Sequence, residues 1–211
     1  MNKNGARRVY RLSTLRITHY DAHCSAIAFG LLIGPAPLHA MPVSYGISTP
    51  DTAIELSWQA FGGTSQAHLA GVTGEFTLDT ANDMDDRLSV NIPVATLAAS
   101  NSLLTWQMKG HLFFDADRYP AIRFTSSRVV ALGGGRFRVF GYLGVKNILR
   151  PVILEAALED PTGNPVGREV LSLHATTAIS RAAFNMDSLA ALVGDTVTID
   201  IAIEAKVRHR A

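Results

Sequence analysis

The chain has 211 residues, of which 47% are hydrophobic, and a formal net charge of +1. Residues 1–40 hold five of its 19 basic residues and one of its 18 acidic residues, so residues 41–211 carry a net charge of −3. No basic cluster with interleaved aromatic residues stands out there, which disfavours nucleic-acid binding. The single cysteine, Cys24, precedes this region, so residues 41–211 exclude disulfides, thiol redox chemistry and cysteine-ligated metals.

The first 40 residues have the pattern of a signal peptide. Five basic residues between Lys3 and Arg16 precede an apolar stretch at 26–34 and the small residue Ala40. The apolar stretch is shorter than the roughly 20 residues that a membrane-spanning helix needs. We therefore expect residues 1–40 to be a signal peptide, residues 41–211 to be one domain, and the protein to be periplasmic. The adjacent arginines at 7 and 8 leave the twin-arginine export route open.

From Ser44 onward, apolar and polar residues alternate over short segments, as in β-strands with one buried face. In chain order, the residues that share a face are Ile54, Leu56 and Trp58; Val72, Phe76 and Leu78; Leu88, Val90, Ile92 and Val94; Ile122 and Phe124; Phe137, Val139, Gly141 and Leu143; Val152 and Leu154; Leu171 and Leu173, leading toward Ile179; and Val197, Ile199, Ile201 and Ile203. Closely spaced strands without alternating helices predict an all-β fold, a single antiparallel barrel or sandwich of about eight strands.

Helix is predicted at only two short sites. Residues 100–102 offer N-caps for a helix that ends near Gly110, and residues 187–193 are expected to form one or two further turns. The three glycines at 133–135 predict a hairpin, and the Gly- and Pro-rich residues 161–168 predict a long hairpin loop.

Catalytic and metal-binding patterns are scarce. The histidines of residues 41–211 are His68, His111, His174 and His209, and they form neither an HExxH motif nor a pair four residues apart. No Gly-x-Ser-x-Gly elbow is present. The acidic run of Asp83, Asp85 and Asp86 predicts a solvated turn, with weak calcium binding as the minority alternative. We expect no cofactor and no metal, although an enzyme that uses His111 or His174 with an aspartate stays open.

Aromatic residues are numerous for a small β-domain, and two interpretations of them are open. They are Trp58, Phe61, Phe76, Trp106, Phe113, Phe114, Phe124, Phe137, Phe140 and Phe184. A barrel of about eight strands has an interior that side chains just fill or that holds one small ligand. The aromatic residues therefore either fill the core or line a pocket for an apolar guest.

Six segments, taken in order, resemble the YceI-like family. They are GVTGEFTLD at 71–79, VNIPVATL at 90–97, FFDADRYPAIRFTS at 113–126, FGYLGVKNILRPVIL at 140–154, AISRAAFNM at 178–186 and VGDTVTIDIAIEA at 193–205. The resemblance implies an exported, lipocalin-like barrel of eight antiparallel strands with a small helical excursion. It also implies an apolar tunnel for a polyisoprenoid chain, and it does not imply catalysis.

The chain departs from the family pattern at four positions. Gly144, Asn147 and Leu149 stand where the family usually has threonine, glycine and threonine, and Asn185 stands where glycine is common. Asparagine tolerates a positive φ better than other residues except glycine, so we expect the turns at 147 and 185 to persist. Leu149 makes its turn more apolar, so we expect a different lipid or less specific binding.

These observations lead to one prediction and two alternatives. We predict a periplasmic carrier that holds a polyisoprenoid, an isoprenoid quinone or a similar lipid, with transient membrane contact and a homodimer as further expectations. The predicted pocket or mouth residues are Trp58, Phe76, Phe113, Phe114, Phe124 and Phe184, and Arg181 is the predicted polar anchor for a phosphate or quinone oxygen. A salt bridge of Arg181 with a neighbouring acid is the alternative. The other classes left open are a barrel enzyme that acts on a lipid or quinone, and an interaction module with a filled core.

Overall fold

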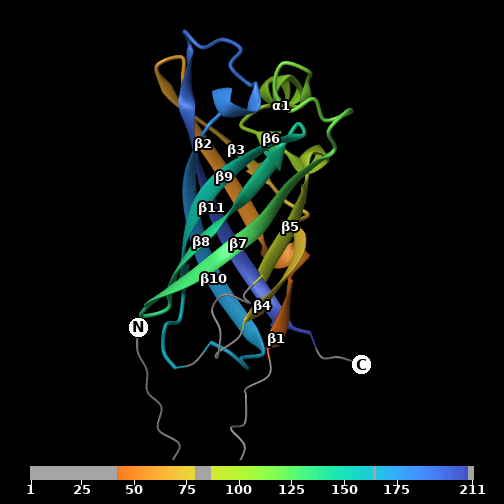
Figure 1. Ribbon diagram of the computed structural model, residues 1–211. Coiled ribbons are helices and arrows are strands. Elements are labelled where there is room, and N and C mark those ends of the chain that lie inside the picture. Colours follow the sequence, from red (N-terminus) through yellow and green to blue (C-terminus); the bar gives the residue numbers. More distant parts are fainter. Residues whose placement is uncertain (1–41, 79–86, 164, 209–211) are drawn as a thin grey trace, which may run out of the picture. The chain divides into compact units, whose positions relative to one another are not determined.

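The computed structural model describes residues 42–78, 87–163 and 165–208, which form one β-sheet and a single α-helix (Figure 1). The strands are β1 Val43–Ile47, β2 Ala53–Ala60, β3 Gly63–Leu69, β4 Thr73–Leu78, β5 Arg87–Pro93, β6 Ala98–Ala99, β7 Ala121–Gly133, β8 Arg136–Val145, β9 Ile148–Leu158, β10 Val170–Ser180 and β11 Val193–Val207. The helices are α1 Ser102–Lys109 and the 3₁₀ helices η1 Thr49–Asp51, η2 Val94–Thr96 and η3 Ala182–Phe184. The predicted signal peptide, the acidic run at 83–86 and His209 lie outside the described residues.

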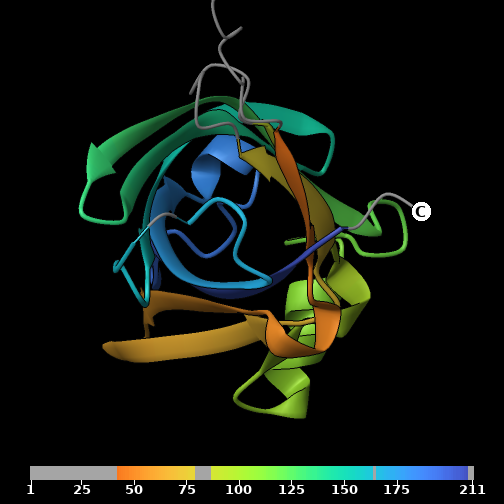
Figure 2. The ribbon, with the colours of Figure 1, turned by 90° about the horizontal axis from the view of Figure 1, so that it is seen from below.

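Within the described residues, eight strands close into a barrel. Their order is β1-β4-β5-β7-β8-β9-β10-β11, and β11 pairs again with β1, where Tyr45 lies opposite Val207. All of the pairs in this ring are antiparallel. The first part of β11 instead pairs with β2, from which β3 and β6 continue the sheet. Figure 2 shows the ring from below. The predicted all-β, antiparallel barrel is confirmed.

Side-chain alternation decides which face of each strand lies inside the barrel. On β8, Val139 and Leu143 are buried, whereas Arg138 and Tyr142 are exposed. Outside the barrel, Arg138 Nε donates to Glu155 Oε1 on the neighbouring strand β9 at 2.6 Å. Because successive side chains of a strand point to opposite faces, closing this sheet buries the apolar face of every strand and leaves the polar face in water.

The tight turns use residues that tolerate a left-handed backbone. Gly133, Gly134 and Gly135 have φ values of 81°, 60° and 70°, and they form the hairpin between β7 and β8 that the sequence predicts. Asn147 and Asn185 have φ values of 61° and 54°, so the expectation for these two family departures is also confirmed.

Helix α1 forms where its capping residues predict. Asn101 is the N-cap, and its Oδ1 accepts a hydrogen bond from the Leu104 amide at 2.9 Å. The second predicted helical segment, residues 187–193, contains no helix: residues 188–192 form turns, and Val193 begins β11. Leu189 has a positive φ of 61° within that segment, which interrupts helical geometry, and the helical turn forms earlier, as η3.

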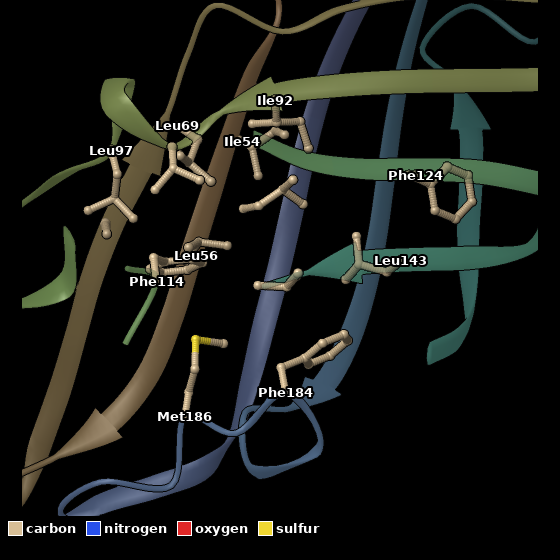
Figure 3. Close-up of a cluster of buried hydrophobic side chains, with 14 of the residues drawn as sticks. Ile54, Leu56, Leu69, Ile92, Leu97, Phe114, Phe124, Leu143, Phe184 and Met186 are labelled. Atoms are coloured by element: carbon tan, nitrogen blue, oxygen red, sulfur yellow. The ribbon is translucent and has the colours of Figure 1, made fainter. Parts of the chain in front are cut away.

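One end of the barrel is covered by an apolar cap. Figure 1 shows α1 at this end, together with the blue turn of η3. Val94, Leu97, Met108, Phe114 and Phe184 are buried there, and Figure 3 labels three of them within the same apolar cluster. The cap therefore extends the hydrophobic core beyond the strands and excludes water from this end.

The loop between β9 and β10 lies across the other end, as Figure 2 shows. Tyr45, which is fully buried and stacked on Phe76 at 5.2 Å, fixes this loop. Its hydroxyl donates to the Pro165 carbonyl at 3.1 Å and accepts from the Gly167 amide at 3.0 Å. Tyr45 on β1, the strand that closes the ring with β11, therefore also fixes the position of the loop between β9 and β10.

This arrangement predicts a pH-dependent stability. Burial is the main cause that raises the pKa of Tyr45 above 10.0, so the folded state retains the proton more strongly than the unfolded state does. The stabilisation is fully present below about pH 10 and is lost as the pH rises through the folded-state pKa. We expect Tyr45→Phe to cost about 1 kcal/mol at neutral pH and to flatten the decline in unfolding free energy above about pH 10.

Denaturant unfolding between neutral and alkaline pH measures both effects. The exposed Tyr142→Phe is the matched control and should retain the decline seen in the wild type. Parallel pH curves for the wild type and Tyr45→Phe would show that the Tyr45 hydroxyl is not responsible.

Candidate binding cavity

The inside of the barrel contains a cavity of about 190 Å³. Its lining runs from Phe114 and Met186 at the cap end to Thr77, Arg87 and Pro165 at the other end. Among the described residues, the polar ones in the lining are Thr52, Thr77, Arg87 and Thr177, and the surface that faces the cavity is apolar. A dry apolar cavity of this kind favours a hydrocarbon guest over water, because it offers water no hydrogen-bond partners.

The cavity exists because many inward side chains are short. Val129 on β7, Val139 on β8 and Ala175 on β10 all line it, and none of them reaches far into the barrel. A ring of eight strands has an interior that larger side chains would just fill. The choice of valine and alanine at these positions therefore leaves space along the barrel axis.

The lack of a side chain at Gly141 allows the Phe124 ring to pack against the barrel wall. A Cβ atom at this position would lie 2.5 Å from Phe124 Cζ and 2.6 Å from the Thr125 carbonyl oxygen. The Phe124 ring can therefore lie directly on the backbone of β8, where any other residue would push it away. Gly141 is an inward position of β8, so its missing side chain also leaves the lumen wider.

The six predicted aromatic residues divide into two groups. Phe76, Phe114 and Phe124 line the cavity. Trp58 and Phe184 are buried in the surrounding core without lining it, and Phe113 is partly buried against that core. Ligand contact by Trp58, Phe113 and Phe184 stays a prediction. Chain order alone could not separate the two groups, because both lie on inward faces or in the cap.

Arg181, the predicted polar anchor, lies outside the cavity lining and is only 4% exposed. Its Nε donates to the Gly194 carbonyl at 2.9 Å, Nη1 donates to the carbonyls of Met186 and Ser188, and Nη2 donates to the Val193 carbonyl at 2.7 Å. These bonds tie residues 186–194 to the end of β10. The guanidinium group is thus occupied with backbone carbonyls, so this geometry supports neither the head-group contact nor the alternative salt bridge.

The comparison with known families agrees with this geometry. A family model described as the YceI-like domain matches residues 45–205. The chain belongs to the YceI-like family. Among its relatives is a UPF0312 protein of Vibrio parahaemolyticus, 26% identical over 167 residues that make up 77% of this chain and 88% of the relative. A UPF0312 protein of Pseudomonas putida is 27% identical over 131 residues, 62% of this chain and 68% of the relative.

Solved structures share the fold of this YceI-like protein. BcnA of Burkholderia cenocepacia has a TM-score of 0.68 and 20% identity, covering 76% of this chain and 99% of BcnA. A polyisoprenoid binding domain from Saccharophagus degradans has a TM-score of 0.60 and 11% identity, covering 79% of this chain and 99% of that domain. At these identities the likeness shows the fold alone. Together with the family, it confirms the lipocalin-like barrel that the six segments predict.

Among the described residues, no histidine lines the cavity of this YceI-like barrel. Nε2 of His174 lies 3.9 Å from Asp200 Oδ1, and both side chains are about half exposed on the outer face of β10 and β11. His111 is exposed in the segment that follows α1. Within the described residues, no three His, Cys, Asp or Glu side chains are grouped so as to hold a metal ion.

Sequence reasoning missed Arg87, which is the only charged residue among the described residues of the cavity lining. It begins β5, lies opposite Thr77 on β4, and is exposed at the end of the barrel away from α1. It directly follows the acidic run at 83–86, which the sequence predicts to be a solvated turn. The strict alternation of Leu88, Val90 and Ile92 locates the strand but does not reveal that its first residue borders the cavity.

The role of Gly141 generates a stability prediction with a built-in control. Gly141→Ala should destabilise the protein by about 2 kcal/mol or more, because the new methyl group overlaps both a ring and a backbone oxygen. Gly144→Ala should cost much less, since its Cβ atom would approach the flexible end of Leu149 at 3.1 Å and the Arg123 carbonyl oxygen only at an ordinary contact distance of 3.6 Å. Chemical denaturation measures both values. Equal losses would show that Phe124 does not depend on close approach to β8.

Proposed function

We propose that the protein is a periplasmic carrier that holds the tail of a polyisoprenoid, an isoprenoid quinone or a similar lipid inside its barrel. The observation that supports this most directly is the continuous apolar lining of the interior cavity. Burial of apolar surface contributes about 25 cal/mol per Å², so some hundreds of Å² of buried tail outweigh the ordering cost of binding. The polyisoprenoid binding domain of Saccharophagus degradans, which shares the fold, is consistent with such a ligand.

The size of the cavity limits how much of the ligand fits without rearrangement. Its volume of about 190 Å³ is below the roughly 300–1,000 Å³ typical of sites for drug-sized ligands. The barrel as described therefore accommodates a slim segment of a tail. A full polyisoprenoid requires inward side chains such as Leu143 and Leu154 to move outward, or the covered ends to open.

The polar end of the proposed ligand belongs at the end of the barrel away from α1. Thr77 and Arg87, which lie opposite each other on β4 and β5, are polar lining residues at that end. The Arg87 guanidinium group suits a phosphate or a quinone oxygen. In this proposal Arg87 takes the part that the sequence assigned to Arg181.

A transient contact with a membrane is part of the same proposal. Several large apolar side chains around the cap are exposed to water, and they are Phe61, Leu103, Trp106, Leu112, Leu189 and Leu192. Trp106 and Phe61 are 73% and 71% exposed, and aromatic residues of this kind favour the boundary between lipid and water. In the described part of the chain, no helix has the length and hydropathy to cross a bilayer.

A homodimer cannot form through the edges of β11, because both edges are already paired within the barrel. This strand pairs with β10 along one side and with β1 and β2 along the other. Barrel closure therefore consumes the isoleucine-rich edge, and a homodimer requires another surface.

Native mass spectrometry and organic extraction of the purified protein test the proposal. We expect an apolar molecule to co-purify, or an added prenyl lipid to bind with one ligand per chain. Val139→Phe, which places a ring inside the cavity, should weaken binding at least tenfold. Ala202→Phe, on the exposed face of β11, should bind like the wild type. A folded wild-type protein that carries no lipid and binds no prenyl chain would contradict the proposal.

A further inference from the structure

Strands β9 and β10 lie side by side but are joined over only part of their length. Their paired positions run from Leu158 opposite Leu173 to Glu155 opposite Thr176, four in all. By contrast, β9 has ten paired positions with β8, and β10 has eleven with β11. The first half of β9 therefore faces the second half of β10 without a backbone ladder.

The ladder between β9 and β10 stops before it reaches Pro151. If the same register continued, Pro151 would lie opposite Ser180, and proline has no amide hydrogen to donate. Side chains bridge the strands instead. Thr177 Oγ1 donates to the Ile153 carbonyl at 2.8 Å, and Arg150 Nε donates to the Ala183 carbonyl at 3.0 Å. We call residues 150–154 and 177–184 the seam.

The interior cavity and a groove on the outer face of the barrel share lining residues at the seam. Val152, Thr177 and Ile179 line the cavity, and the same three residues also line a groove on the outer face of the barrel. Tyr142 and Ile153, each 48% exposed, contribute apolar surface to the groove, which is unusual for an outward face of this sheet.

Phe184 fills the cap end of the seam. It is only 1% exposed, although it also lines the outer groove, and Figure 3 shows it just beyond the end of β10. The short helix η3 that carries it is fixed at its start, where the Ala182 amide donates to Asp195 Oδ1 at 2.9 Å and the Ala183 amide donates to Ser180 Oγ at 3.2 Å. These hydrogen bonds therefore hold η3 in place, and the Phe184 side chain lies next to the part of the seam that lacks backbone pairing.

We propose that the seam is a lateral portal through which a hydrocarbon tail moves between the outer groove and the cavity. This inference rests on the proposed function. The cap closes one end of the barrel with buried side chains, and the loop fixed by Tyr45 crosses the other end. Parting the seam breaks two side-chain hydrogen bonds and displaces the Phe184 ring, whereas parting any fully paired pair of strands breaks a ladder of backbone bonds.

A tail fits the seam better than an added peptide strand does. The Ile153 and Ala183 carbonyls, which a strand would need as acceptors, are already engaged by Thr177 and Arg150. The surfaces on both sides of the seam are largely apolar. A hydrocarbon tail needs no hydrogen-bond acceptors and gains free energy from apolar contact, so it suits a seam whose carbonyls are engaged and whose surfaces are apolar.

Cross-linking tests the portal. In a Cys24→Ser background, Ile153→Cys with Ala178→Cys places one thiol on each side of the seam, and oxidation closes it. The matched control, His174→Cys with Ala202→Cys, joins residues that already lie opposite each other on the fully paired strands β10 and β11. Uptake and release of cis-parinaric acid, a fluorescent fatty acid, are followed by stopped-flow fluorescence before and after oxidation, with cross-link formation checked by mass.

We expect oxidation of the seam pair to slow uptake and release at least tenfold, with the dissociation constant unchanged and with recovery after reduction. Oxidation of the control pair should leave both rates unchanged. A second pair of variants avoids cross-linking. Thr177→Val removes the bridging hydrogen bond and should speed exchange several-fold, whereas Thr176→Val, at a paired position, should not.

The outcomes separate the portal from the proposed function. Normal binding with unchanged rates in the oxidised seam variant and in Thr177→Val would overturn the portal and leave the carrier proposal intact. Equal slowing by both cross-links would also overturn it, because general stiffening of the barrel would then explain the effect. Failure of the wild-type protein to bind cis-parinaric acid and prenyl lipids alike would overturn the carrier proposal and the portal together.

Discussion

Closure of the sheet into a ring is the constraint on which the rest of the structure depends. Once β11 pairs with β1, the circumference of the barrel is set by backbone hydrogen bonds, and the volume of the inward side chains alone decides whether a space remains. Val139 and Ala175 line the space with short side chains, and Gly141 lets the Phe124 ring lie against the wall. The apolar cavity follows from these choices.

The two ends and the wall of the barrel are closed by different interactions. Buried apolar side chains close the cap end, and Arg181 stabilises the loop beside it through bonds to backbone carbonyls. Two hydrogen bonds to one hydroxyl, that of Tyr45, hold the loop at the opposite end. The seam between β9 and β10 relies on side chains in place of a ladder. These differences in the number and kind of bonds favour the seam as the place where the barrel opens at a low free-energy cost.

Local patterns predicted much of the fold, and long-range contacts account for what they missed. Alternation located the strands, Asn101 located the helix, and the glycines at 133–135 located a hairpin, because each of these effects acts within a few residues. The partners of Arg181 are carbonyls of a loop whose path depends on the whole fold, so its sequence neighbours could not identify them. Which aromatic rings face the lumen likewise depends on the strand register and on Gly141, against which the Phe124 ring packs.

A crystal structure with a bound bromine-labelled hydrocarbon chain tests the central claim most directly, because anomalous scattering locates the bromine independently of any assumption about the site. The account predicts a bromine peak inside the ring, between Phe124 and the inward side chains of β8 to β10. A peak found only on the outer surface, with the inward side chains packed together along the whole axis, would contradict it.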